Sequence, residues 1–175
     1  MRIPTVTMLA LGLCACAGAG QRTDADDAPR ARASLASTQG QLARGDLELR
    51  QDARGVRITG RLQGLEPAAA HGFHVHEKGD CSALDASSAG AHYNPGGVAH
   101  GNPSMPPHHA GDIANVLEDA SGRTDVDAHV EGVSLGGAND IVGRSIIVHA
   151  DPDDYASQPA GNSGARIACG VIVAD

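Results

Sequence analysis

The sequence predicts an all-β fold of the sandwich or flattened-barrel type, with two long functional loops. From about residue 33 onward, short alternating or β-branched runs are separated by turn residues, and beyond the N-terminal stretch no window of helical length keeps a helical period. Short, regularly spaced strands of this kind are typical of sandwiches and barrels. Two Gly- and Pro-rich stretches, 77–109 and 151–164, separate some of these runs, and loops of this length inside a compact domain are usually functional.

The predicted strands begin with a hairpin. Residues 47–51 alternate at period two, the segment Asp-Ala-Arg-Gly at 52–55 breaks the pattern, and 56–62 resumes it. A further turn is predicted at Ser121-Gly122. The other strands are expected at 72–76, 113–117, 124–133, 145–149 and 166–173.

The N-terminus is predicted to be a targeting segment, with a lipoprotein signal peptide over 1–15. Arg2 precedes an apolar run that is too short to span a bilayer as a mature helix. The run leads into Leu-Cys-Ala-Cys, and Cys16 fits as the lipidated residue because a small residue, Ala15, precedes it. An ordinary secretory signal cleaved nearby is the alternative, and both predict export. Residues 16–32 are small, polar and Asp-rich, which favours a flexible tether.

The composition limits the kinds of partner that are expected. The chain has 13 Lys and Arg against 21 Asp and Glu, with a formal net charge of −8. A nucleic-acid-binding protein normally presents a basic face, so nucleic acid is not expected as a partner. Aromatic residues are almost absent, and the core is therefore expected to consist of Val, Ile, Leu and Ala.

Two cysteines, Cys81 and Cys169, remain outside the signal region. Export to an oxidising compartment favours a disulfide between them. Closing so long a loop would stabilise the fold by roughly 4–5 kcal/mol in the chain-entropy model. The alternative is metal ligation by the thiolates, which is less favoured because the histidines already suffice.

Histidines concentrate between residues 71 and 109 at spacings suited to metal ligands. His74 and His76 lie on one face of a predicted strand, because side chains alternate faces, and two such imidazoles can hold one ion. Two solvated surface histidines are the alternative reading of that pair. Three nitrogens and one carboxylate, in a set suited to tetrahedral zinc, come from His92, His100, His109 and Asp112. Gly111 is expected to allow a tight turn between the last two ligands. We do not expect His71, His108 or His129 to be ligands.

The chain resembles the copper–zinc superoxide dismutases over residues 33–175, and its details are similar to the bacterial branch. Two features carry the similarity to that branch: Cys81 directly follows Gly-Asp, and the stretch from His149 to Cys169 lacks a Lys/Glu-rich segment. The motifs that carry the resemblance are GFHVH at 72–76, AGAHYNP at 89–95, HAGD at 109–112, IIVHADPDD at 146–154 and GNSGARIACGVI at 161–172. The resemblance implies an eight-stranded Greek-key form of the predicted sandwich.

The resemblance also implies a role for each site residue. Copper and zinc are the implied cofactors, and four nitrogen ligands suit Cu(II). His92 would bridge the two ions and donate a proton, Arg166 would bind the substrate anion, and Asp153 would hydrogen-bond to free nitrogens of His74 and His100. Copper would be held by His74, His76, His92 and His149, and zinc by His92, His100, His109 and Asp112.

The implied activity is the dismutation of superoxide to dioxygen and hydrogen peroxide, which would protect the cell envelope from oxidative damage. Ala17, rather than an aspartate, follows Cys16, which favours anchoring to the outer membrane by an N-terminal lipid, in the periplasm or beyond. The sequence leaves open whether the protein forms a homodimer. Two rival functions remain at this point: a copper-buffering domain of the same fold without catalysis, and a lipoprotein that zinc stabilises.

Overall fold

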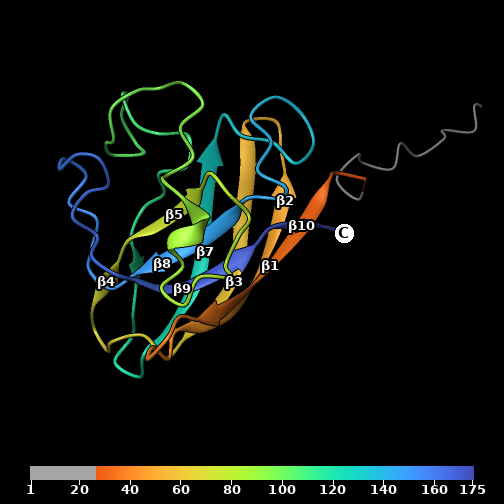
Figure 1. The fold of residues 1–175 in the computed structure, drawn as a ribbon. Coiled ribbons are helices and arrows are strands. Elements are labelled where there is room, and N and C mark those ends of the chain that lie inside the picture. The colour runs from red at the N-terminus through yellow and green to blue at the C-terminus, as the bar shows by residue number, and fades with distance from the viewer. Residues whose placement is uncertain (1–26) are drawn as a thin grey trace, which may run out of the picture.

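The computed structural model describes residues 27–175, and this part of the chain is almost entirely β-structure (Figure 1). Its one helical element is the short 3-10 turn η1, Ser87–Ala89. Within the same residues, no helix has the length and apolar character needed to cross a membrane. The strands are β1 (Arg30–Ser37), β2 (Arg44–Gln51), β3 (Gly55–Gln63), β4 (Ala70–His71), β5 (Phe73–His76), β6 (Val116–Leu117), β7 (Arg123–Glu131), β8 (Ser145–His149), β9 (Arg166–Val171) and β10 (Val173–Ala174). The predicted all-β class is confirmed.

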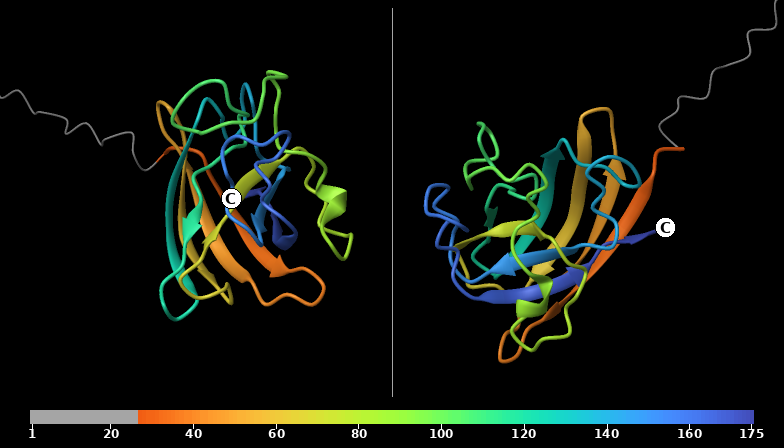
Figure 2. Two further views of the ribbon diagram at one scale, coloured as in Figure 1. Left: turned by 90° about the vertical axis from the view of Figure 1, so that its left-hand side faces the viewer. Right: turned by 45° about the horizontal axis from the view of Figure 1, so that its top comes forward.

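Most strands form one eight-stranded sheet that is strongly curled (Figure 2). Its order is β5-β8-β9-β1-β2-β3-β7, with β10 beside β1, and β4 and β6 form a separate two-stranded ribbon. The first strand joins the two walls of the sheet: its early residues pair with β2, whereas Ala36 and Ser37 pair with Cys169 and Ala168 of β9. This pairing of the first strand with the last long strand gives the sandwich its Greek-key character.

The core lies inside the curl and follows from strand alternation. In β2, Leu47 and Leu49 are buried while their neighbours face solvent. Phe73 is fully buried, and the rest of the main cluster is almost entirely aliphatic, as the composition predicts. Burial of each such side chain contributes about 1.5–3 kcal/mol. Among residues 27–175, the buried hydrophobic side chains extend from Ala31 to Ile172.

Two long connections carry little regular structure, as predicted. One runs from β5 to β6 and contains η1, and the other joins β8 to β9. Both lie on the side of the molecule away from the start of β1 (Figures 1 and 2).

The strands differ from the predictions in three places. The first strand, β1, is not among the predicted strands. It begins at Arg30, within the predicted tether 16–32, and Ala31 is buried in the core, so the domain starts about three residues earlier than 33. The reason is that β1 buries alanines, which give a weak hydrophobic signal. The predicted strand 113–117 is reduced to β6, and 166–173 is divided into β9 and β10. The predicted signal peptide and Cys16 lie outside the described residues.

Candidate metal centre

Strand β5 places the first two histidines. Phe73 and Val75 point into the main core, and His74 and His76 point to the other face. Both histidines are nevertheless almost fully inaccessible to solvent, at 0% and 1%. The alternative reading of a solvated surface pair is therefore wrong.

The long loop after β5 returns twice to the free edge of this strand. The Tyr93 N–H donates to the Val75 carbonyl (2.8 Å), and the Val75 N–H donates to the Gly111 carbonyl (2.9 Å). Backbone bridges also pair His76 with His92 and His74 with Asp112. Ordinary strand-type hydrogen bonds thus bring together ligands that are far apart in the sequence.

The predicted tight turn between the last two ligands is present, with the Asp112 N–H donating to the His109 carbonyl (3.1 Å), but the turn is not what requires Gly111. Its φ is not positive, so the backbone conformation does not demand glycine. A Cβ at this position would instead lie 2.3 Å from the Val75 carbonyl oxygen. The glycine therefore permits the close approach of the loop to β5.

The first ligand set, His74, His76, His92 and His149, comes together as the resemblance implies. One nitrogen from each lies within 4.8 Å of the others, and all four residues are buried. Strand β8 supplies His149, which follows the buried run 145–148 and lies close enough for its Nε2 to be 3.4 Å from His76 Nε2.

In each of the rings of His74, His76 and His149, one nitrogen donates a hydrogen bond and leaves the other free to bind a metal. His76 Nδ1 donates to the Gly90 carbonyl (3.0 Å) and His149 Nδ1 to the Gly164 carbonyl (3.3 Å), which leaves Nε2 of both rings with a lone pair. His74 is reversed, because its Nε2 donates to Asp153 (2.9 Å) and Nδ1 is left free. Such second partners fix the tautomer and orientation of metal-binding histidines.

The second set, His92, His100, His109 and Asp112, is also assembled and buried. Asp112 Oδ1 is 2.9 Å from His92 Nδ1, and Oδ2 is 3.0 Å from His100 Nδ1. The His109 N–H donates to Asp112 Oδ2 (2.8 Å). Burial alone would raise the pKa of Asp112, but the contacts with His92 and His109 hold it below its ordinary value. The carboxylate is therefore charged at neutral pH.

Three imidazoles of the first set, His74, His76 and His149, are held neutral. Burial lowers the pKa of His76 to about 2 and that of His149 to about 4, and it also lowers the pKa of His74. A neutral imidazole has the lone pair that a metal requires.

Within the two ligand sets, four buried ring nitrogens have no hydrogen-bond partner among residues 27–175: His74 Nδ1, His92 Nε2, His100 Nδ1 and His109 Nδ1. Outside the sets, His71 Nε2 also has none. Buried polar atoms are nearly always satisfied, so this many orphans in one place need an explanation. A four-nitrogen set fits copper, and a three-nitrogen, one-carboxylate set fits zinc. The residues present thus fit both cofactors of the resembled family, and His92 is common to both sets.

The Asp153 carboxylate contacts a histidine of each ligand set. Its Oδ2 accepts from His74 Nε2 and its Oδ1 from His100 Nε2, both at 2.9 Å. The contact is possible only beside Gly161, where a Cβ would lie 1.8 Å from Asp153 Oδ1. Asn115 fixes the backbone of Asp153, donating to its carbonyl (2.9 Å) and accepting from its N–H (2.8 Å).

Arg166, the first residue of β9, borders the pocket over the first set together with His76, His92 and His149. Its guanidinium donates to the carbonyls of Ala86 (2.6 Å) and Gly90 (2.5 Å). Burial lowers its pKa, an effect that Asp85 opposes. Two of the five N–H donors are thus directed to the loop, and the other three make no hydrogen bond within residues 27–175.

The predicted disulfide between Cys81 and Cys169 is present, with a Cα–Cα distance of 5.8 Å. Thiolate ligation of a metal is therefore not the role of these residues. The bridge, together with Ala86, Ala89 and Ile147, forms a small second core. This core positions Ala86, whose carbonyl accepts a hydrogen bond from the Arg166 guanidinium.

The sequence reasoning missed several supporting residues. Gly90 acts through its carbonyl, and Asn115 and Gly161 act on Asp153, and none of these roles has a signature in the spacing of side chains. His71 was expected at a strand edge and not as a ligand. It is buried outside both ligand sets, and its Nδ1 donates to the His149 carbonyl (2.8 Å).

Comparison with known proteins agrees with this centre. A family model described as copper/zinc superoxide dismutase matches residues 43–172. A protein of Aquifex aeolicus named superoxide dismutase (Cu-Zn) 2 is 42% identical over 150 residues, covering 82% of this chain and 86% of the relative. An extracellular superoxide dismutase (Cu-Zn) of Brugia pahangi is 39% identical over 137 residues, covering 73% and 68%.

Solved structures show the same likeness. The crystal structure of a double mutant of a SOD-like protein from Bacillus subtilis is 39% identical, with a TM-score of 0.74. The match covers 81% of this chain and 96% of that one.

Proposed function

This chain belongs to the copper/zinc superoxide dismutase family and is an oxidoreductase of that type, and we propose that it works through a copper site and a zinc site joined by His92, with Arg166 as the anion-binding residue. The observation that supports this most is the sharing of His92 by two buried ligand sets beside a pocket that Arg166 borders. The overall reaction converts two superoxide anions and two protons to dioxygen and hydrogen peroxide. Copper, when bound, supplies the one-electron redox chemistry that zinc cannot.

Arg166 would bind and orient the substrate anion. The protein carries a net charge of −8, so the attraction of superoxide has to be local rather than general. A guanidinium offers a permanent positive charge and several donors in fixed geometry. The carbonyls of Ala86 and Gly90 hold this group at the mouth of the pocket.

His92 would hold and deliver a proton at Nε2. Its Nδ1 lies 2.9 Å from Asp112 on the zinc side, so Nε2 is directed toward the copper side, where it has no hydrogen-bond partner. An imidazole in this place can give its proton to a reduced substrate anion in the pocket. The zinc set keeps the ring fixed while this occurs.

The intact ligand sets also bear on the two rival functions. A copper-buffering domain has no need of Arg166 over the pocket, and a domain that only zinc stabilises has no need of the buried set His74, His76 and His149. Catalysis explains both features together.

Substitution of Arg166 tests the proposal. Arg166→Lys keeps the charge but loses the forked geometry, so the dismutation rate should fall in part. Arg166→Ile should lower it much further and weaken inhibition by azide, while both metals remain bound. Full activity of the isoleucine variant at several ionic strengths would contradict the role.

Arg144 provides a matched control for a purely structural arginine. It also donates to loop carbonyls, those of Glu77 and Asp140, and stacks on the Tyr93 ring, but it does not border the pocket. Arg144→Ile should therefore affect stability without changing azide inhibition. The same loss of azide binding in both variants would mean that Arg166 only ties the loop together.

We further propose that the protein protects the cell envelope from an exported, lipid-anchored position. The disulfide between Cys81 and Cys169 is of the kind that persists in oxidising compartments, and the Brugia relative is named as extracellular. The proposed anchor at Cys16, in the outer membrane, rests on the sequence alone. Cys16→Ser should release the protein into soluble fractions, and unchanged membrane association would argue against this anchor. A homodimer stays a prediction, which sedimentation velocity would test.

A further inference from the structure

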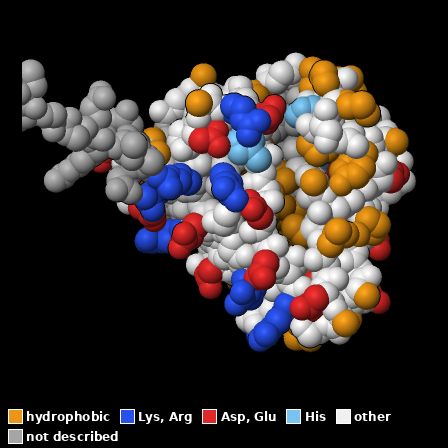
Figure 3. All heavy atoms as spheres, turned by 180° about the vertical axis from the view of Figure 1, so that it is seen from behind, with side chains coloured by type: hydrophobic (Ala, Val, Ile, Leu, Met, Phe, Trp, Pro, Cys, Tyr) orange, Lys and Arg blue, Asp and Glu red, His pale blue; other side chains and the backbone are white. Residues whose placement is uncertain are grey.

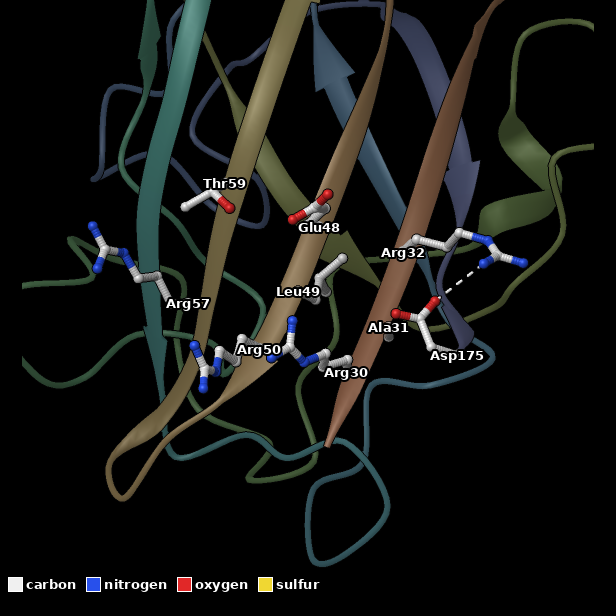
Figure 4. Close-up of a pocket in the computed structure, with 9 residues that line it drawn as sticks. All are labelled: Arg30, Ala31, Arg32, Glu48, Leu49, Arg50, Arg57, Thr59 and Asp175. Atoms are coloured by element: carbon white, nitrogen blue, oxygen red, sulfur yellow. Dashed lines mark hydrogen bonds and ion pairs between the residues drawn. The ribbon is translucent and has the colours of Figure 1, made fainter. Parts of the chain in front are cut away.

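A row of basic side chains crosses the outer face of the curled sheet. In the strand register, Arg30 of β1 lies opposite Arg50 of β2, Arg50 opposite Arg57 of β3, and Arg57 opposite His129 of β7. We call Arg30, Arg50 and Arg57 the basic row. Figure 4 shows these three side chains on neighbouring strands, with Arg30 next to Arg50. All three are exposed and border one pocket on this face.

The basic row is unusual because like charges directly opposite one another on a sheet are destabilising. Arg57 is compensated by a two-point contact with Asp127, at 2.8 and 2.6 Å. Arg30 and Arg50 have no ion-pair partner among residues 27–175. Two adjacent guanidinium groups are thus left without a counter-charge in the described structure.

In the neighbouring rows of the same face, basic side chains lie opposite acidic ones. In one row, Arg32 lies opposite Glu48 and also contacts Asp175 at 3.2 Å. In the next row, Arg61 lies opposite Asp125 and contacts it at 2.8 Å. The mixed charges there compensate locally, so uncompensated arginines are a property of the basic row and not of the whole face.

The basic row also lies where the chain enters the domain. Arg30 is the first residue of β1, and Figure 3 shows basic side chains, with acidic ones among them, on this face beside the start of the described chain. Only 13 residues (29 − 16) separate the proposed anchor Cys16 from β1, so the first strand stays within about 45 Å of a membrane. The metal-site loops lie on the far side of the molecule (Figure 1).

We propose that the basic row binds the phosphate groups of an anionic lipid surface, so that the outer face of the sheet lies against the membrane and the metal centre faces away from it. Guanidinium groups bind phosphate oxygens through paired hydrogen bonds and keep their charge at any physiological pH. The remainder of the protein is acidic and would be repelled by the same surface. Attraction at one face and repulsion elsewhere together select a single orientation.

A vesicle-binding experiment tests this without the lipid anchor. The protein from Ala17 to Asp175, which contains every core residue found among residues 27–175, is sedimented with two kinds of vesicle. One kind contains phosphatidylglycerol and phosphatidylcholine, and the other contains phosphatidylcholine alone. We expect binding to the anionic vesicles only, and weaker binding as salt is added. Each basic residue near such a surface contributes about fivefold, so Arg30→Gln/Arg50→Gln should reduce binding on the order of 25-fold.

The same strands offer a matched control. Arg44 and Arg123 are exposed at the other end of β2 and β7, each opposite Gln63. Arg44→Gln/Arg123→Gln makes the same change in net charge and should leave most of the binding intact. The metal-loaded forms of both double variants should retain full dismutase activity, which shows that they are folded.

Three results would overturn the proposal. One is equal loss of binding in the two double variants, which would indicate a general charge effect. Another is equal binding of the parent protein to both kinds of vesicle. The third is binding only after Asp26→Asn/Asp27→Asn, which would mean that the chain's own acidic stretch occupies the basic row. None of these results depends on whether Cys16 is acylated.

Discussion

Replacing Gly161 with alanine should damage the zinc site. Gly161 has a φ of +64° and belongs to neither ligand set. A Cβ there would lie 1.8 Å from Asp153 Oδ1 and 2.7 Å from His100 Nε2. The added methyl group would therefore occupy the space in which Asp153 and His100 make their hydrogen bond.

The size of the effect follows from these distances. An ordinary contact of 3.4 Å requires the carboxylate oxygen to move by about 1.6 Å (3.4 − 1.8), which breaks its 2.9 Å hydrogen bond to His100. Loss of a partner that orients a metal-binding histidine typically costs 10–100-fold in metal affinity, or about 1.4–2.7 kcal/mol. The positive φ adds about 1–2 kcal/mol of strain to the fold.

Gly97→Ala separates these two effects. Gly97 also has a positive φ, +59°, but nothing lies within 4 Å of its Cβ position. Both variants should lose similar stability from backbone strain, as measured by denaturant unfolding. Zinc affinity, measured by competition with a chromophoric chelator, should fall 10–100-fold for Gly161→Ala and hardly at all for Gly97→Ala. Equal zinc affinities in the two variants would mean that crowding of Asp153 by a side chain at position 161 does not affect the zinc site.

Three further changes test other parts of the structure. Phe73→Ala should lower the free energy of unfolding by about 3–5 kcal/mol, because this ring is the largest of the fully buried side chains; a loss below 1 kcal/mol in denaturant titration would contradict the packing. Burial, reinforced by Asp119, raises the pKa of Glu118 to about 7, so the folded state binds more protons than the unfolded state and stability should fall as pH rises from about 4.5 to about 7. Glu118→Gln should flatten that part of the stability profile, and an unchanged profile would count against a buried carboxyl. Asp112→Ala should abolish zinc binding and leave copper binding possible, since it removes the only anionic side chain of the zinc set; equal zinc content in variant and parent would show the ligand set to be wrong.

The sequence predicted the features that depend on periodicity. Alternation along β5 separates Phe73 and Val75 from His74 and His76, and the structure shows the two pairs on opposite faces. Turn residues and alternating runs likewise located β2, β3 and β8. These features depend on neighbours in the chain, which a sequence displays directly.

Features that depend on close packing between distant segments could not be read in this way. β1 buries alanines, whose apolar signal is too weak to mark the start of the domain at Arg30. The need for glycine at 111 and 161 arises from contacts with Val75 and Asp153, which the fold alone creates. The assignment of Asp153 came from the family resemblance, since one aspartate in a loop carries no signal of two histidine partners.

The most direct test of the central claim is the decay of superoxide, followed by stopped flow, with protein of known copper and zinc content. We expect protein holding one copper and one zinc per chain to accelerate the decay, and the same protein holding zinc alone not to. If protein with both metals bound left the decay unchanged, the proposed dismutation would be contradicted and a copper-binding domain without catalysis would be favoured.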